Sequence, residues 1–156
     1  MLTGIINLVF TLLALLLIDK LGQKKLMLFG SLAMAVSMAV LSIVFYMNTL
    51  NNYFVLVLIL LYIAFFAVSW GATIWVYIAE IFPNSIRGTA SSIATFANWG
   101  MNFLVSLTFP VLLVRLGGAG TFGLYALFNF ISFLFVYKFI FETKGVSLEE
   151  IESIQV

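Results

Sequence analysis

The chain has 156 residues, of which 64% are hydrophobic and 8% are charged, and its formal net charge is +1. Because soluble domains carry about 25% charged residues, this composition excludes an ordinary soluble globule. Cysteine and histidine are both absent, which removes disulfides, thiol nucleophiles and the commonest zinc ligands. The composition predicts a membrane protein that uses neither a metal nor another cofactor, and nothing in it indicates a nucleic-acid partner.

Long apolar stretches follow one another along the chain. A bilayer core about 30 Å thick requires roughly 20 apolar residues per spanning helix. Five such stretches lie at residues 2–18, 26–47, 54–80, 89–114 and 121–141. They are longer than barrel strands and lack sustained alternation of polar and apolar residues. The sequence therefore predicts an all-α membrane domain of about five transmembrane helices over residues 1–141, followed by a cytoplasmic tail over residues 142–156.

The beginning of the chain raises the question of a signal peptide. The first segment has no basic residues before it and no small-residue cleavage pattern after it, so we expect it to remain in the mature chain. With about 17 residues it is near the lower limit for a span. The chain is therefore expected to be the end of something longer.

Basic residues are concentrated in alternate connections between the segments. Lys20, Lys24 and Lys25 follow the first segment, Arg87 follows the third, Lys138 and Lys144 flank the end of the fifth, and the other connections hold only Arg115. Cytoplasmic loops are enriched in lysine and arginine. We therefore expect the C-terminus and the first and third connections to lie in the cytoplasm and Met1 to lie outside.

The connections are short and contain turn residues, at 19–22, 48–52, 83–85 and 117–120. Short connections make consecutive helices antiparallel neighbours. After Glu142 the composition becomes polar, and Ser147 followed by Glu149 and Glu150 has the pattern of a helix N-cap and first turn. The tail is expected to form a short amphipathic helix on the cytoplasmic face.

The fourth segment carries polar residues on one side. Ser91, Thr95, Asn98, Asn102 and Ser106 fall within an arc of about 80° on an α-helix. Amides that face lipid are costly, so this stripe should face either another helix, through hydrogen bonds, or a water-filled cavity. Trp99 at the edge of the arc favours the cavity. An aromatic ring beside amides suits a sugar, which has apolar C–H faces and a rim of hydroxyl groups.

The third segment offers a second group of candidate ligand-binding residues. Gly71 and Trp75 are four residues apart and share a helix face, and Phe66 precedes them. The stretch 69–73 is prone to turns, so we expect a locally unwound helix that directs backbone groups inward. The composition leaves open whether Trp75 packs in the core or contacts a ligand.

The third segment ends in Glu80, and Pro83 separates this acid from Arg87. A carboxylate at a helix C-terminus opposes the helix macrodipole unless a cation is near. The pair is therefore expected to form an ionic clamp at the membrane surface. The alternative is that both side chains are merely hydrated loop residues.

Four motifs occur in order along the chain, at Asp19–Lys25, at Ser69–Gly71 with Trp75, at Glu80–Gly88, and at Glu142–Gly145 with Leu148–Glu150. Together they resemble the signatures of the sugar porter branch of the major facilitator superfamily. The pattern is most similar to that of the bacterial xylose–proton symporters. The resemblance implies a fold of twelve helices in two bundles, of which this chain corresponds to the last five.

The resemblance also implies roles for individual residues. Trp75 matches a tryptophan that contacts the sugar, and Asn98 matches the position of a sugar-binding amide. Residues that match the lining of the same cavity are Phe66, Gly71, Trp99 and Asn102. Residues that match a cytoplasmic charge network, which latches the outward-facing state in the family, are Asp19, Lys20, Lys24, Glu80, Arg87 and Glu142.

The chain departs from the family pattern in two motifs. Lys20 and Gln23–Lys24 stand where arginines are usual, and Phe141 stands where a proline is usual. Lysine cannot form the bidentate contacts of arginine, so we expect a looser latch. The glutamine-rich seventh helix of the family and its proton-coupling acid and arginine have no counterpart. Because these parts are missing, the chain is expected to contain half of a sugar site and no proton site.

The resemblance implies that the chain is part of a carrier in the bacterial inner membrane. This carrier would transport a monosaccharide such as xylose or glucose, coupled to protons. Its expected partners are the lipid bilayer and the missing helices, supplied either by a longer protein or by a separate chain. The alternative is a non-transporting membrane protein that is vestigial or depends on a partner. No nucleophile with a base and no metal cluster supports an enzyme.

Overall fold

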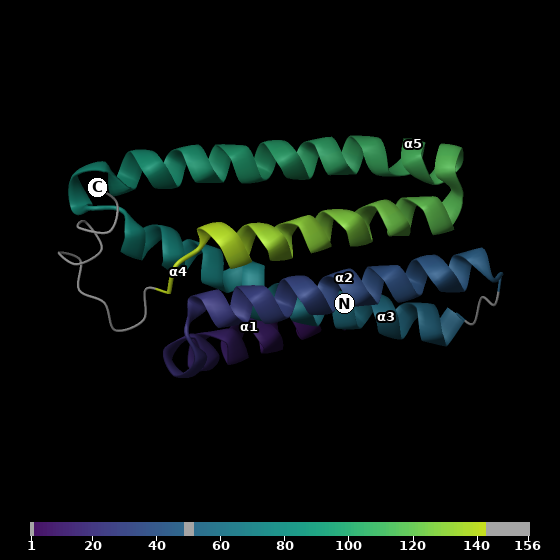
Figure 1. Ribbon diagram of the computed structural model, residues 1–156, viewed down its shortest axis with the longest axis horizontal. Helices are drawn as coiled ribbons and strands as arrows, with labels where there is room; N and C mark the ends of the chain where they lie inside the picture. Colours follow the sequence, from purple (N-terminus) through teal and green to yellow (C-terminus); the bar gives the residue numbers. More distant parts are fainter. Residues whose placement is uncertain (1, 49–51, 143–156) are drawn as a thin grey trace.

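Figure 1 shows the computed structural model, which describes residues 2–48 and 52–142. Within these residues the regular structure is entirely helical, in agreement with the predicted all-α class. The helices are α1 (Leu2–Leu21), α2 (Gln23–Tyr46), α3 (Asn52–Phe66), the π-helix η1 (Ala67–Gly71), α4 (Ala72–Ile81) and α5 (Asn84–Phe139). The helix expected after Ser147 lies outside the described residues, as does most of the connection predicted at 48–52.

A single non-helical residue, Gly22, joins α1 to α2. The sequence placed Asp19 and Lys20 in a turn, but both residues continue α1, which ends at Leu21. Gly22 has φ 86° and ψ 160°, a conformation that is essentially restricted to glycine. One such residue is enough to end a helix and begin the next, and the turn is therefore shorter than predicted.

The segments α3, η1 and α4 form one helical run that changes its winding in the middle. The stretch expected to unwind is instead wound as a π-helix over Ala67–Gly71. Near this wider turn the hydroxyl of Ser69 donates a hydrogen bond to the Phe65 carbonyl at 2.6 Å, and that of Thr73 donates to the Val68 carbonyl at 3.4 Å. Hydroxyl groups thus supplement the backbone pairing where the regular α-helical pattern is interrupted.

Phe82 and Pro83 separate α4 from α5. Phe82 is extended, with φ −104° and ψ 132°, and proline cannot donate the backbone hydrogen bond that would continue α4. The Pro83 carbonyl accepts hydrogen bonds from the backbone N–H groups of Ile86 at 3.1 Å and Arg87 at 3.0 Å. The first turn of α5 therefore forms directly after the proline, and the helix begins earlier than the predicted span.

Helix α5 has 56 residues and is divided by Gly117, which has the non-helical angles φ 68° and ψ 178°. Figure 1 shows that the chain folds back at this point, so that α5 consists of two antiparallel arms. The predicted turn of four residues is again shorter in the structure, because Gly118, Ala119 and Gly120 belong to the second arm. The aromatic rings of Phe109 and Phe122 lie 6.4 Å apart and link the two arms near the turn.

Four helices in the described residues are long and apolar enough to cross a membrane. They span Thr3–Leu21, Gln23–Tyr46, Asn52–Ile81 and Asn84–Phe139. The spans predicted at 89–114 and 121–141 lie on the two arms of the last of these helices. The count of five transmembrane spans, their limits in the bilayer and the division into a membrane domain and a tail stay predictions.

Helix α2 is the centre of the packing. Its buried residues Met38, Leu41 and Val44 form one cluster with Leu58 of α3, and aromatic side chains of the second α5 arm cover it. Toward the other end, Met27 packs with Tyr77 of α4 and Val136 of α5. The first arm of α5 lies beyond the second arm (Figure 1) and exposes large apolar side chains, such as Phe96 at 82% and Phe103 at 67%. Such surfaces suit contact with lipid or with further helices.

Candidate functional site

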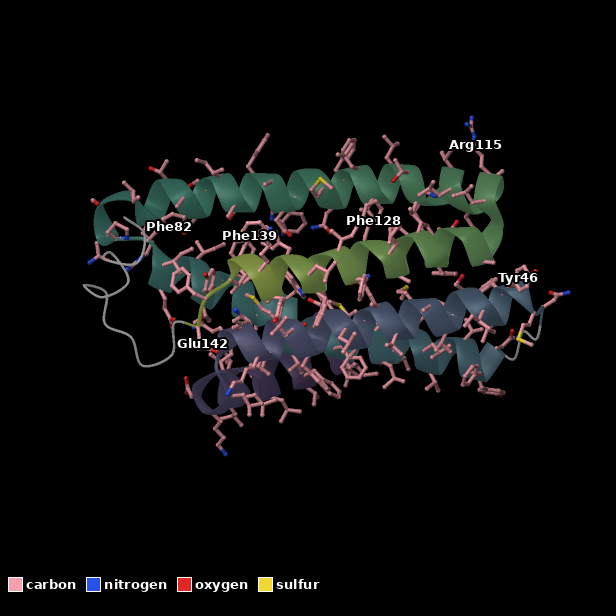
Figure 2. All side chains as sticks on the ribbon, in the orientation of Figure 1. Tyr46, Phe82, Arg115, Phe128, Phe139 and Glu142 are labelled. Carbon is pink, nitrogen blue, oxygen red and sulfur yellow. The ribbon has the colours of Figure 1, made fainter. Side chains whose placement is uncertain are left out.

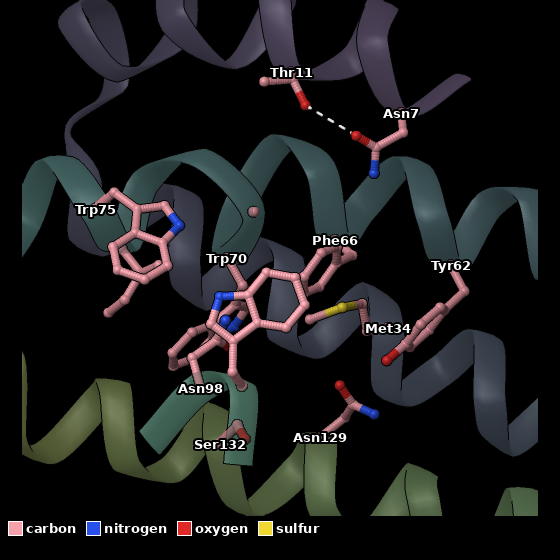
Figure 3. A pocket seen from close by; sticks show the side chains of 13 residues that line it. Asn7, Thr11, Met34, Tyr62, Phe66, Trp70, Trp75, Asn98, Asn129 and Ser132 are labelled. Carbon is pink, nitrogen blue, oxygen red and sulfur yellow. Dashed lines mark hydrogen bonds between the residues drawn. The ribbon is translucent and has the colours of Figure 1, made fainter. Parts of the chain in front are cut away.

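A cavity of about 810 Å³ lies between the α3–η1–α4 run and the two arms of α5, with α1 and α2 contributing to its wall (Figure 3). The lining residues come from every long helix: Asn7, Thr11, Met34, Tyr62, Phe66, Trp70, Gly71, Ile74, Trp75, Asn98, Trp99, Asn129 and Ser132. None of these described residues is charged. The cavity thus combines aromatic and aliphatic walls with a few neutral polar groups, which is the usual composition of a site for a neutral polar ligand.

The aromatic wall contains all three tryptophans of the chain. Trp70 belongs to η1, Trp75 to α4 and Trp99 to the first arm of α5. The first two line the same cavity although they are five residues apart, a spacing that on a regular α-helix rotates the side chains by about 140°. Indole rings provide large apolar faces together with one N–H donor each.

Polar groups enter the cavity from α1 and from both arms of α5. On α1, the Thr11 hydroxyl lies 3.5 Å from the Asn7 amide oxygen (Figure 3). On α5, Asn98 belongs to the first arm and Asn129 to the second. The Asn129 amide nitrogen donates to the Tyr125 carbonyl at 2.8 Å, and Figure 3 shows the Tyr62 hydroxyl directed toward the Asn129 side chain. Amides can donate and accept at once, so these groups suit the hydroxyls of a sugar.

The structure brings five of the six predicted sugar-binding residues to this one cavity, namely Phe66, Gly71, Trp75, Asn98 and Trp99. Asn102 is the exception. Its amide nitrogen donates to the Asn98 carbonyl of its own helix at 2.9 Å, and its side chain is exposed. Whether the five residues bind a sugar stays a prediction.

Sequence reasoning missed eight residues of the lining: Asn7, Thr11, Met34, Tyr62, Trp70, Ile74, Asn129 and Ser132. For two pairs a signal was present. Asn7 and Thr11 are four residues apart in an apolar segment, and Asn129 and Ser132 are three apart in another. Such spacings place two polar groups on one helix face. The remaining four carry no such signal, because an aromatic or aliphatic side chain in an apolar helix is equally suited to lipid, core and cavity.

Local hydrogen bonds satisfy most of the polar side chains in the stripe of the fourth predicted segment. The side chains of Thr95, Asn102 and Ser106 each donate to the carbonyl oxygen four residues earlier, at 2.7 to 2.9 Å. Bonds to the backbone of the same helix satisfy these donors without a second helix or a cavity. Only Asn98 among the residues of the stripe lines the cavity.

A second polar cluster lies at the end of the molecule where Glu142 is labelled in Figure 2. Gln23 is 2% exposed and stands at its centre. The Gln23 side-chain amide donates to the Glu80 carboxylate at 2.6 Å, and the Gln23 backbone N–H donates to the Glu142 carboxylate at 2.9 Å. The ends of α4 and α5 are therefore tied to the beginning of α2 through one neutral residue.

Glu142 acts as a cap for α2. Gly22, the residue before this helix, has no side chain that caps the helix, and the Glu142 carboxylate accepts the Gln23 N–H in its place. A negative charge at a helix N-terminus is favourable because the helix macrodipole is positive there. A Cβ atom on Gly22 would overlap the Glu142 carboxylate, so the absence of a side chain at Gly22 makes this approach possible.

The predicted clamp between Glu80 and Arg87 is not formed among the described residues. Glu80 pairs with Gln23, whereas the Arg87 guanidinium donates to the Phe82 carbonyl at 3.1 Å. Asp19 and Lys20, near the end of α1, are exposed, and Lys24 in the first turn of α2 is half-buried. Arg115 lies at the opposite end of the molecule from Glu142 (Figure 2). The residues of the predicted charge network thus gather at one end, and a role as a latch stays a prediction.

Comparison with known proteins agrees with these features. The family described as "Sugar (and other) transporter" matches residues 1–154. The arabinose-proton symporter of Bacillus subtilis (strain 168) is 42% identical over 98% of this chain and 33% of its own length. The D-xylose-proton symporter of Escherichia coli (strain K12) is 41% identical over 97% of this chain and 32% of its own length. The chain therefore spans about a third of the length of the curated relatives that it matches.

Solved structures of the xylose transporter XylE share the fold. The structure of this proton:xylose symporter bound to 6-bromo-6-deoxy-D-glucose has a TM-score of 0.87 and 41% identity, and the match covers 97% of this chain and 33% of that chain. The inward-open structure of XylE from E. coli has a TM-score of 0.87 and 43% identity, with 97% and 34% covered.

The family match covers almost the whole chain, and the relatives and the structures agree with it. These proteins are carriers, in agreement with the expectation that the chain is not an enzyme. The names of both relatives include proton symport, and the described residues of this chain include the long apolar helices that the sequence predicted. The chain belongs to the sugar porter family of the major facilitator superfamily and is similar to the bacterial xylose–proton symporters.

Proposed function

We propose that this chain is the C-terminal part of a monosaccharide carrier, equivalent to the last five of twelve helices, and that its cavity forms one half of the sugar site. The observation that carries the proposal is the convergence of five residues with predicted sugar-binding roles on a single uncharged cavity. These residues come from two different helical runs, so their meeting is a property of the fold and not of their spacing in the sequence.

The chemistry of the cavity favours a monosaccharide. The indole faces of Trp75 and Trp99 match the apolar C–H faces of a pyranose, and the Asn98 amide can bind two neighbouring hydroxyls. Among the described residues, the lining has no charged side chain that would select a charged substrate. The names of the relatives, which include symporters of D-xylose and arabinose with protons, support a pentose or hexose as the ligand and coupling to protons.

The charged end of the molecule supports a cytoplasmic location for that end. Lys20 lies at the end of α1, Lys24 and Lys25 at the beginning of α2, and Arg87 at the beginning of α5. The Gln23 bonds bring the ends of α4 and α5 to the same place. By the positive-inside rule this end faces the cytoplasm. In a bacterium, the membrane is then the inner membrane, and the chain after Glu142 is cytoplasmic.

At that end, the Gln23 cluster supports a role in alternating access. Contacts that join helix ends on one side of a carrier favour the state that is closed on that side. Gln23 occupies a position where the family pattern has arginine, and an amide forms weaker contacts with carboxylates than a guanidinium does. The latch in this chain is therefore weaker than one centred on arginine.

The experiment that tests the proposal measures sugar binding in the chain purified together with the first seven helices of a related porter. Trp75→Ala and Asn98→Ala should each abolish detectable xylose binding while membrane insertion stays normal. Tyr46→Ala is the matched control, because Tyr46 is 83% exposed and lies about 18 Å along α2 from Met34, which lines the cavity. Binding that survived both cavity substitutions would show that the site assignment is wrong.

A non-transporting protein is the second candidate, and the large exposed apolar surface of α1 and α5 favours it. This surface must contact lipid or a partner. The two candidates differ in sugar binding, since a vestigial chain that inserts into the membrane would bind no sugar even with the complementing helices.

A further inference from the structure

Trp70 lines the cavity but differs from the other two tryptophans in the state of its indole N–H. The Trp70 Nε1 donates a hydrogen bond to the Ser31 hydroxyl oxygen at 2.7 Å. Trp75 and Trp99 line the same cavity and are 38% and 68% exposed. Trp70 is more buried than either. The Trp70 N–H is therefore bonded within the protein, and the Trp70 ring is the part that can contact a ligand.

The partner of Trp70 is held in place by tight packing between α2 and η1. Ser31 is fully buried on α2, and Ser69, the neighbour of Trp70 on η1, is also fully buried. A Cβ atom on Gly30 would overlap the Ser69 side chain, so the absence of a side chain at Gly30 allows α2 and η1 to pack closely at this point. The bond between Trp70 and Ser31 therefore lies at a closely packed, buried contact between α2 and η1.

This arrangement gives Trp70 a chemical role distinct from that of Trp75 and Trp99. An indole whose N–H is already bonded offers a ligand only its apolar ring, whereas a free indole can also donate to a hydroxyl group. The cavity therefore has one tryptophan suited solely to C–H faces. The Ser31 bond also restricts rotation of the ring, which lowers the entropy lost when a sugar stacks on it.

We propose that Trp70 is a third aromatic wall of the sugar site and that Ser31 is the positioning residue that fixes the orientation of its ring. The proposal rests on the proposed function, because it names a further contact of the same sugar. The competing explanation is that the bond serves only to join α2 to η1. These two explanations predict different results for substitutions at Ser31 and Trp70.

Four variants distinguish these explanations. Ser31→Ala and Trp70→Phe each remove the hydrogen bond and keep an aromatic ring, whereas Trp70→Leu removes the ring. Ser37→Ala is the matched control, because Ser37 lies on the same helix, is also buried, and donates only to the Ala33 carbonyl within α2 at 2.8 Å. All four variants keep the size of the side chain or reduce it, so none of them overfills the core.

The first measurement is the xylose dissociation constant of the chain purified with the first seven helices of a related porter. Ser31→Ala and Trp70→Phe should each weaken binding about three- to tenfold, and the double variant should be no weaker than either single variant, since both changes remove one bond. Trp70→Leu should weaken binding at least about tenfold, and Ser37→Ala should leave it within about twofold.

The second measurement is acrylamide quenching of tryptophan fluorescence in this chain alone, which needs no sugar. Ser31→Ala should increase the quenching because it frees the Trp70 ring, and Ser37→Ala should not. Unchanged quenching in Ser31→Ala would overturn the positioning role. If the unsubstituted complex binds xylose and Trp70→Leu binds it equally well, the aromatic wall is refuted while the proposed function stands. A complete lack of binding by the unsubstituted complex would refute both.

Discussion

Asn98 and Asn102 lie one turn apart on α5, yet their side chains have different surroundings. Asn98 lines the cavity, whereas the Asn102 amide is bonded to the carbonyl of Asn98 and is exposed. A spacing of four residues places both amides on one face of a helix, which is why the sequence predicted a shared role. The choice between a ligand and the helix backbone depends on the side-chain rotamer, which spacing does not determine.

This difference predicts separate phenotypes for the two asparagines. Asn98→Ala should abolish detectable sugar binding, because the cavity loses the only amide on the first arm of α5 among the described lining residues. Asn102→Ala should change the dissociation constant by less than about threefold, since its lost bond is local. Equilibrium binding of radiolabelled xylose to the complemented chain measures both. Equal losses in the two variants would contradict the cavity as described.

Gln23 has a large structural role for a neutral residue, since it bonds two carboxylates from distant parts of the chain. Gln23→Leu keeps the backbone bond to Glu142 but leaves Glu80 without its amide donor. We expect the free energy of unfolding to fall by about 1–3 kcal/mol. Thermal or denaturant unfolding in detergent measures this change.

Gln23→Arg should raise the free energy of unfolding, with a gain that diminishes at high salt. Equal stability in all three forms would show that the cluster contributes nothing.

At the scale of elements, the positions of the helices followed from the sequence far better than their ends did. Apolar stretches of about 20 residues identify helices because the bilayer requires that length. The turns were predicted too long, because Asp19 and Lys20 continue α1 and the residues after Gly117 continue α5. Polar residues near a helix end are compatible with helix and loop alike. The helix end is determined by a single glycine with positive φ, and the conformation of that glycine depends on tertiary packing.

The π-helix could not be predicted for a related reason. The stretch 69–73 contains residues that favour turns, and the sequence indicated a local irregularity there. Whether that irregularity becomes an unwound segment or a wider helical turn depends on its neighbours. In the structure, α2 packs against η1 at Gly30 and Ser31 and holds Trp70 in place. These contacts join residues about 40 positions apart, beyond any local pattern.

The chain reverses direction at Gly117, between the two arms of α5. The backbone angles φ and ψ of Gly117 are nearly inaccessible to other residues. Gly117→Ala should lower the free energy of unfolding by about 1–3 kcal/mol. Gly100→Ala is the matched control, because Gly100 is helical, has open space where a Cβ would lie, and should gain stability by about 0.5–1 kcal/mol. Thermal unfolding of the two variants in the same detergent provides the comparison. A neutral effect at Gly117 would contradict the sharp reversal.

At the scale of the whole molecule, two observations support the proposal that the chain is one part of a larger carrier. It matches about a third of the length of its relatives, and its first α5 arm exposes many large apolar side chains. The walls of the cavity come from all the long helices of the described residues. The family could be named from four sequence motifs, but Met34, Tyr62, Trp70 and Ile74 could be assigned to the cavity only from the fold that brings them together.

The measurement that tests the central claim most directly is uptake of radiolabelled xylose and glucose into sugar-transport-deficient bacteria. The cells express this chain alone, the first seven helices of a related porter alone, or both. We expect uptake only when both are present, and we expect Trp75→Ala to abolish it. Absence of uptake with both parts, despite confirmed membrane insertion of each, would contradict the claim that this chain supplies half of a sugar site.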